Sequence, residues 1–259
     1  MWESRISRAE QLAAQFPAAK GLLAFYGRLL GAQQEIYGSL RRRKGWLPSG
    51  VIESDLPAVR AMLPRLLMVV EESGSEALAA EAQRLLRADE SETDQLLLDY
   101  WRAPGGEQFF AKSFLQPYAQ WLVESGSKPV DRNLEGGPNR CPHCGGRPQL
   151  SFLRSVEGAQ GDGGRSLLCS TCLSAWPFRR VLCVHCGEER PVRLNYFNSP
   201  DYQHVRIEAC DSCGHYLKGI DLTRLGRAVP LVDEVAAAPL DLWAHEQGYT
   251  KIELNLVGL

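Results

Sequence analysis

The feature that most constrains this chain is its eight cysteines, all of which fall into four Cys-x-x-Cys pairs. A Cys-x-x-Cys turn directs two thiolates at one metal ion, about 2.3 Å from each sulfur, and two such turns complete a tetrahedron. The four pairs therefore predict two four-cysteine metal sites. The predicted ligands are Cys141, Cys144, Cys169, Cys172, Cys183, Cys186, Cys210 and Cys213.

The spacing of the pairs indicates which of them share an ion. The gaps between successive pairs hold 24, 10 and 23 residues. Cys-Pro-His-Cys-Gly at 141–145 aligns with Cys-Val-His-Cys-Gly at 183–187, which indicates an internal repeat. The repeat favours sequential pairing, in which the first two pairs bind one ion and the last two bind the other. Interleaved pairing, the first with the third and the second with the fourth, remains the alternative.

Four thiolates in a tetrahedron suit Zn²⁺ and also a single iron, as in rubredoxin. Zn²⁺ is the first choice, because closed four-cysteine sites are commonly structural zinc, and iron is the second. Gly145, Gly187 and Gly214 each follow the second cysteine of a pair, where a glycine accepts a positive φ. Leu173 takes that place in the second pair, so we expect its turn to be built differently.

Residues 1–126 have the apolar periodicity of helices. Pro64 and Pro117 lie inside helical patterns and should each mark a helix start or a kink, and Pro239 should divide or kink the C-terminal helix. Helices are expected over 19–40, 57–72, 75–88, 91–102, 106–125 and 231–249, with a loop over 41–54 and strands near 149–154 and 193–197.

These elements predict an α+β chain, in which a helical N-terminal domain precedes two tandem zinc-ribbon or rubredoxin-like modules and a C-terminal helix. The expected organisation is a helical domain at 1–126, a linker at 127–140, four-cysteine modules at 141–180 and 181–222, and a helical tail at 223–259.

The composition indicates a cytoplasmic protein. No apolar run reaches the roughly 18 residues that a membrane helix needs, and the first ten residues lack the apolar core of a signal peptide. In a reducing cytoplasm, clustered cysteines are more often metal ligands than disulfides.

Two other classes of protein use similar motifs. A nucleic-acid-binding zinc ribbon needs a positive surplus, but residues 141–219 hold nine basic and seven acidic residues, and two Zn²⁺ with eight thiolates would bring the formal charge to about −2. A thiol–disulfide oxidoreductase needs a helix to follow the motif, and Gly145-Gly146-Arg147-Pro148 is a poor helix start. No catalytic residue is predicted, since the sequence has no phosphate loop, His-Glu-x-x-His helix or nucleophile elbow.

The sequence resembles the FdhE family, the accessory proteins needed to form active formate dehydrogenase in bacteria. The likeness is carried by the four cysteine pairs and by 108–119, 206–218 and 239–249, whereas the ending at 255–259 departs from the family pattern and the N-terminal region is short for it. The resemblance implies a non-catalytic, cytoplasmic maturation factor that binds the catalytic subunit of formate dehydrogenase, a subunit with molybdenum or tungsten and iron–sulfur cofactors. Oligomeric state is left open.

Overall fold

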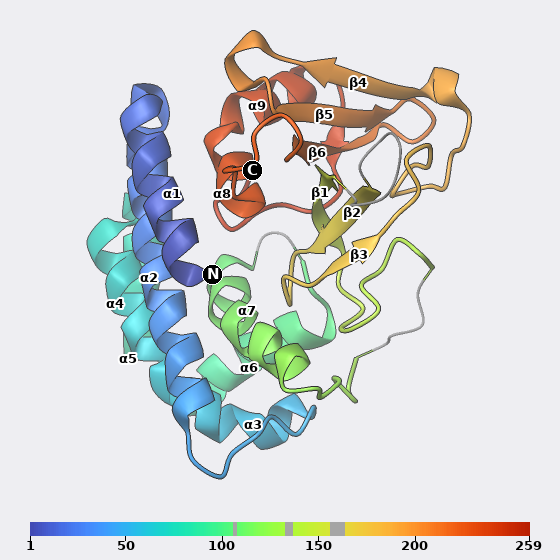
Figure 1. The fold of residues 1–259 in the computed structure, drawn as a ribbon. Helices are drawn as coiled ribbons and strands as arrows, with labels where there is room; N and C mark the ends of the chain where they lie inside the picture. Colours follow the sequence, from blue (N-terminus) through green and yellow to red (C-terminus); the bar gives the residue numbers. More distant parts are fainter. Residues whose placement is uncertain (106–107, 133–136, 156–163) are drawn as a thin grey trace.

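The computed structural model describes residues 1–105, 108–132, 137–155 and 164–259. A helical N-terminal part lies beside a C-terminal part that is built on one sheet, with two short helices packed against that sheet (Figure 1). This arrangement confirms the predicted α+β class, with a helical N-terminus, strands that carry the cysteines, and C-terminal helices. The predicted domain boundaries stay predictions.

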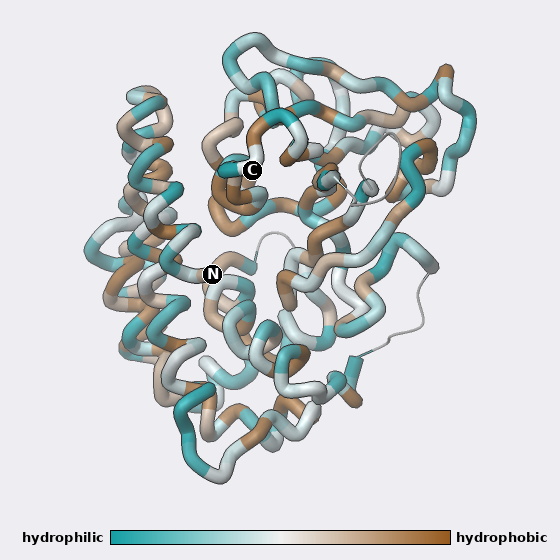
Figure 2. The backbone as a smooth tube through the Cα atoms, in the orientation of Figure 1, coloured by the Kyte–Doolittle hydropathy of each residue, from teal (hydrophilic) through white to brown (hydrophobic). Residues whose placement is uncertain are grey.

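The helical part surrounds one central helix, α7. Its residues from Phe110 to Gln120 are buried, as expected for a helix enclosed on all sides, and α2, α4 and α6 pack against it. The outer helices alternate between hydrophilic and hydrophobic residues along the backbone (Figure 2). The elements are α1 (Trp2–Gln15), η1 (Pro17–Ala19), α2 (Lys20–Arg42), α3 (Ile52–Val59), η2 (Arg60–Met62), α4 (Leu63–Ser73), α5 (Glu76–Arg87), α6 (Glu90–Arg102) and α7 (Phe109–Glu124).

The predicted helix over 57–72 is in fact two helices joined by the 3-10 turn η2, and the first of them begins at Ile52, inside the predicted loop. Pro64 occupies the first turn of α4, where its missing N–H costs nothing, so the proline marks a helix start as predicted. Pro117 instead lies within α7. Residues 106–107, where the last helix was expected to begin, and 133–136 of the predicted linker lie outside the described residues.

The sheet is two antiparallel three-stranded ribbons joined edge to edge. The strand order is β3-β2-β1-β6-β5-β4, and β7 also pairs with β6. The joining pair, β1 with β6, is parallel and sets Leu150 opposite Lys218. Both predicted strands are present, as β1 and β4. The strands are β1 (Pro148–Arg154), β2 (Gly164–Cys169), β3 (Ala175–Pro177), β4 (Leu194–Asn198), β5 (Val205–Cys210), β6 (His215–Asp221) and β7 (Thr250–Lys251), with 3-10 turns η3 (Pro191–Arg193) and η4 (Pro200–Tyr202).

The C-terminal helices α8 (Pro230–Ala236) and α9 (Ala238–Glu246) are separate, as Pro239 predicted, and a buried group of four charges fixes them to the sheet. Lys218 of β6 contacts Glu234 of α8 at 3.0 Å and also pairs with Asp241 of α9. Lys251 of β7 contacts the same two acids, at 2.5 and 3.0 Å. Two cations and two anions thus compensate one another, which a buried charge requires.

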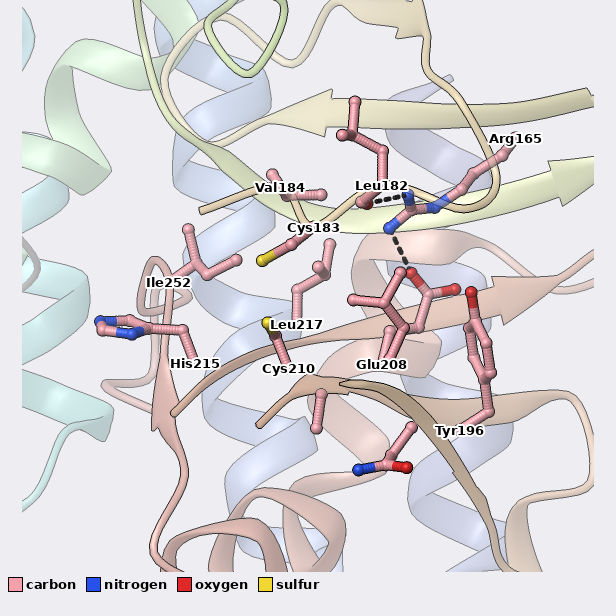
Figure 3. A pocket seen from close by; sticks show the side chains of 13 residues that line it. Arg165, Leu182, Cys183, Val184, Tyr196, Glu208, Cys210, His215, Leu217 and Ile252 are labelled. Atoms are coloured by element: carbon pink, nitrogen blue, oxygen red, sulfur yellow. Dashed lines mark hydrogen bonds and ion pairs between the residues drawn. The ribbon is translucent and has the colours of Figure 1, made fainter. Parts of the chain in front are cut away.

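A second buried ion pair crosses the sheet face. Two strands, β1 and β6, lie between Arg165 of β2 and Glu208 of β5, yet their side chains meet at 2.5 Å (Figure 3). Gly219 of β6 lies beneath this contact, and a Cβ there would be 2.4 Å from Oε1 of Glu208. Because position 219 has no side chain, the carboxylate of Glu208 has room to form the ion pair that joins the two ribbons.

The N-terminal helix is fixed to α8 by a third buried pair. Arg8 of α1 binds Asp233 through two nitrogens, at 2.6 and 3.0 Å, and His204 Nε2 lies 2.7 Å from the same carboxylate. Burial alone would raise the pKa of Asp233, but hydrogen bonds with His204 and Arg8 outweigh it and lower that pKa. The ionised form of Asp233 is thus the form that holds α1 to the sheet part.

We predict that Gly219→Ala destabilises the protein by about 3 kcal/mol, because the new Cβ would displace the buried carboxylate of Glu208 from its ion pairs with Arg206 and Arg165. Gly31→Ala is the matched control, since Gly31 lies within α2 with open space around it and alanine there should stabilise by up to about 1 kcal/mol. Urea unfolding at neutral pH measures both. Equal stability of the two variants would contradict the role given to Gly219.

The buried acids also predict how stability depends on pH. Burial favours a high pKa for Glu234, but Lys218 and Lys251 lower it to about 2, below the value of about 4.3 in an unfolded chain. The stability that this carboxylate contributes is therefore present above pH 4.3 and is lost as the pH falls towards 2.

Glu234→Gln should accordingly lose on the order of 3 kcal/mol at pH 7, and its deficit against the parent should shrink between pH 4.5 and 2. Because both proteins would release metal in acid, the difference between their unfolding curves isolates Glu234. The exposed Glu10→Gln should show no pH-dependent deficit. A Glu234→Gln deficit that stays constant with pH would refute this account.

Candidate metal centres

The structure brings the eight cysteines together in two sequential groups. Cys141, Cys144, Cys169 and Cys172 form the first centre, with sulfur atoms within 4.8 Å of one another. Cys141 and Cys172 are 3.6 Å apart at sulfur, and Cys144 and Cys169 are 3.4 Å apart. Disulfide sulfurs would be about 2.05 Å apart, so these are free thiols. The pairing is sequential, and the interleaved alternative is excluded.

The second centre repeats the arrangement with Cys183, Cys186, Cys210 and Cys213. Its sulfur contacts from Cys183 to Cys213 and from Cys186 to Cys210 are both 3.8 Å. A tetrahedral ion with metal–sulfur bonds of 2.3 Å holds its ligands about 3.8 Å apart, so both groups fit one tetrahedral ion. The two centres can therefore each bind a metal ion, and the eight cysteines remain our proposed ligands.

The two centres occupy corresponding positions in the two ribbons. In each ribbon one cysteine pair precedes the first strand, and the other lies at the turn between the last two strands: β2 and β3, or β5 and β6. Each first turn closes with the same two backbone bonds. Cys141 donates to Gly146 and accepts from Gly145, and Cys183 donates to Glu188 and accepts from Gly187.

The turn at Leu173 is not built differently, which corrects the prediction made from its side chain. Leu173 adopts a φ of +60°, close to the +69° of Gly145 and the +76° of Gly187, and it is the one non-glycine residue with positive φ among the residues described. Cys169 N–H donates to Ser174 O, the same closing bond as in the glycine turns. The left-handed conformation costs roughly 1–2 kcal/mol without glycine, and packing of the leucine against the core near Leu150 opposes that cost.

The two centres differ in burial. All four cysteines of the first centre are at most 1% exposed and belong to the same hydrophobic core as the helical part. Gln116 of α7 donates to Ser170 O at 2.9 Å and so fixes the second turn of this centre to the central helix. In the second centre Cys186 is exposed and Cys213 half-buried, while Cys183 and Cys210 point toward each other beneath the surface (Figure 3).

The electrostatics of the first centre also favour a cation. Hydrogen bonds with the thiols of Cys141, Cys144 and Cys169, followed by burial, raise the pKa of Cys172 well above its ordinary value. A bound divalent ion reverses that preference and deprotonates its thiol ligands. Backbone N–H groups already point at sulfur in both centres, from Thr171 to Cys169 and from His185 to Cys183.

Two histidines lie against the second centre. The rings of His185 and His215 stack with centroids 3.6 Å apart and planes 7° apart, and each has a nitrogen within 4.8 Å of the Cys213 sulfur. Burial and the neighbouring His215 lower the pKa of His185. His185 and His215 lie far apart in the chain, so no local sequence pattern predicts their contact.

The sequence is similar to one family of known proteins. The family model described as FdhE, central domain, matches residues 140–180, and the model described as FdhE, C-terminal domain, matches residues 181–257. In the described residues no helix is both long and apolar enough to cross a membrane.

A protein named Protein FdhE homolog from Aquifex aeolicus is 30% identical over 274 residues, covering 99% of this chain and 95% of that protein. A Protein FdhE homolog from Haemophilus influenzae is 27% identical over 203 residues, covering 76% of this chain and 65% of that protein. The crystal structure of the FdhE protein from Pseudomonas aeruginosa has the same fold, with a TM-score of 0.69, 24% identity, and coverage of 99% of this chain and 94% of that one.

We predict two metal ions per chain, measured by elemental mass spectrometry on protein purified without added metal.

A chelator should remove the ion of the second centre at least tenfold faster than the ion of the first, because Cys186 is exposed while the first centre is buried. Cys186→Ser should retain one ion and most of the fold, whereas Cys144→Ser should destabilise the core, since metal-binding energy is folding energy. A Cys144→Ser protein with two ions and unchanged stability would refute the ligand assignment.

Proposed function

The chain belongs to the FdhE family, and from that premise we propose that it is a cytoplasmic accessory protein that binds the catalytic subunit of formate dehydrogenase while the active enzyme forms. The observation that carries the proposal is a pair of four-thiol centres on one rigid sheet, one buried and one at the surface. The proposal assigns no catalytic residue to the chain. Its role would be to recognise an unfinished client and hold it until assembly is complete.

The cysteine chemistry supports the proposed compartment. Eight thiols lie within a few ångströms of one another in two groups, and none is disulfide-bonded. Such an arrangement persists in a reducing cytoplasm and would oxidise outside it. Zn²⁺ remains the proposed ion, since the first centre is closed on all sides as structural zinc sites are.

The second centre supports a specific client-binding face. Exposed apolar side chains lie in the segments that carry this centre, at Val181, Val192 and Tyr196, with exposed fractions of 43%, 79% and 45%. Tyr196 OH donates to Arg180 O and so joins two of these segments. A bound metal ion would hold these loops rigid, so their apolar side chains would lose little conformational entropy when a partner binds.

Exposure of the second centre also favours a second candidate function, electron transfer by a rubredoxin-like iron. The potential of such an iron is set by solvent access and by N–H groups that donate to the ligand sulfurs. Cys186 is exposed, and Cys183 accepts from two backbone N–H groups, at 3.4 and 3.5 Å. Iron content with visible thiolate-to-iron absorption would favour this candidate, and zinc without visible absorption would exclude it.

We predict that the tagged, metal-loaded chain captures the catalytic subunit of formate dehydrogenase from its native host. Val192→Asp should weaken this capture at least tenfold, because a desolvated carboxylate would face the apolar client contact. Leu47→Asp is the matched control, since Leu47 is 65% exposed but lies on the helical part, and it should capture normally. Failure of the parent chain to capture the subunit would overturn the function, whereas equal capture by both variants would overturn the binding face alone.

A further inference from the structure

A basic cavity lies beside the first centre. Its volume is about 220 Å³, and the described residues that line it include Arg102, Arg132, Arg140 and Arg147 and one acid, Glu253. The arginines come from α6, from the segment after α7 and from both sides of the first cysteine pair, so the fold gathers them from distant parts of the chain.

Among the residues that the structure describes, few acids compensate this positive charge. Glu253 is already bound by the buried Lys112 at 2.7 Å, and Arg102 pairs with Glu53 outside the cavity. Within the described ranges, no carboxylate forms an ion pair with Arg132, Arg140 or Arg147. Arg132 and Arg140 are half-buried and Arg147 is exposed, so the three guanidinium groups stay accessible to an anion that enters the cavity.

Arg132 has a hydrogen-bond donor, Nη1, that no described residue satisfies. Its guanidinium stacks on the buried ring of Trp101, 4.9 Å from the centroid, and its Nη1 is buried without a hydrogen-bond partner among the described residues. The neighbouring Asp131 does not supply one, and its two oxygens instead accept from Trp101 Nε1 at 2.9 Å and from Ile52 N at 3.0 Å. Arg132 is therefore held in place with a donor unused.

We propose that this cavity binds the phosphate or pyrophosphate group of a small anion. Guanidinium forks bind phosphate oxygens in pairs, and three of them match an anion of charge −2 or more better than a single carboxylate. The volume is below the 300 Å³ or more of most small-molecule sites, so the cavity takes free phosphate or the phosphate end of a larger molecule.

The first centre alone does not account for the arginines. A divalent ion with four thiolates carries a formal charge of −2, and Arg140 and Arg147 lie close to its ligands in the sequence. That charge would balance two guanidiniums at a distance, but it offers no hydrogen-bond acceptor to Arg132 Nη1. An oxyanion in the cavity supplies both the charge and the acceptor.

Isothermal titration of the metal-loaded full chain with sodium pyrophosphate, inorganic phosphate and ADP, at matched ionic strength, tests the proposal. We expect saturable one-to-one binding of pyrophosphate, weakened at least tenfold in Arg140→Gln/Arg147→Gln and unchanged in Arg65→Gln, whose arginine pairs with Glu35 on the surface of the helical part. Arg132→Lys keeps the charge but loses the planar fork, and should bind several-fold more weakly.

The three ligands distinguish the sources of the phosphate. Tighter binding of ADP than of phosphate would identify the end of a larger molecule, and equal or weaker binding of ADP would identify free phosphate. Absence of saturable binding by all three would overturn the proposal. Unchanged affinity of the double variant for pyrophosphate would also overturn it. If the parent binds no anion and the double variant loses its metal, the arginines serve only to balance the charge of the thiolates, and the proposal is likewise wrong.

Discussion

The parallel pairing of β1 with β6 is the contact on which the rest of the structure depends. Each ribbon by itself is three short strands, and a sheet of that size with one four-thiol centre has little apolar surface to bury. Joined at β1 and β6, the two ribbons offer one surface wide enough for α8 and α9 to cover. The same join brings Arg165 and Glu208 into contact and sets Lys218 beneath Glu234.

Beside the apolar core that its parts share, the molecule is joined across those parts by buried charges in matched groups. Arg8 with Asp233 joins α1 to α8, Lys112 with Glu253 joins α7 to the C-terminal segment, and Arg165 with Glu208 joins the ribbons. Buried pairs add little net stability against apolar alternatives, but losing one partner is costly. Such contacts therefore specify one arrangement of helices and ribbons, because any other would leave ions buried without partners. Among the described residues of the basic cavity, this matching is incomplete.

The sequence was sufficient for features that depend on residues close together in the chain. Cysteine spacing predicted the two centres and favoured their sequential pairing, Pro64 marked a helix start, and Pro239 marked the division of the C-terminal helix, because turn geometry is local. Leu173 was misread, since glycine preference is an energy of about 1–2 kcal/mol that tertiary packing can oppose. The β1–β6 pairing, the His185–His215 stack and the arginine cavity were beyond prediction, because each joins segments whose proximity only the complete fold decides.

Because Gly219 has no side chain, the residues that can be accepted at positions 165, 208 and 219 depend on one another. A side chain can be accepted at 219 only if the carboxylate of Glu208 moves away, and this movement weakens its ion pairs with Arg206 and Arg165. Substitutions at 165, 208 and 219 should thus be acceptable in combination where each alone is harmful. Among related chains these three positions would change together, and a larger residue at 219 would mark a lineage in which the two ribbons are joined by a different contact.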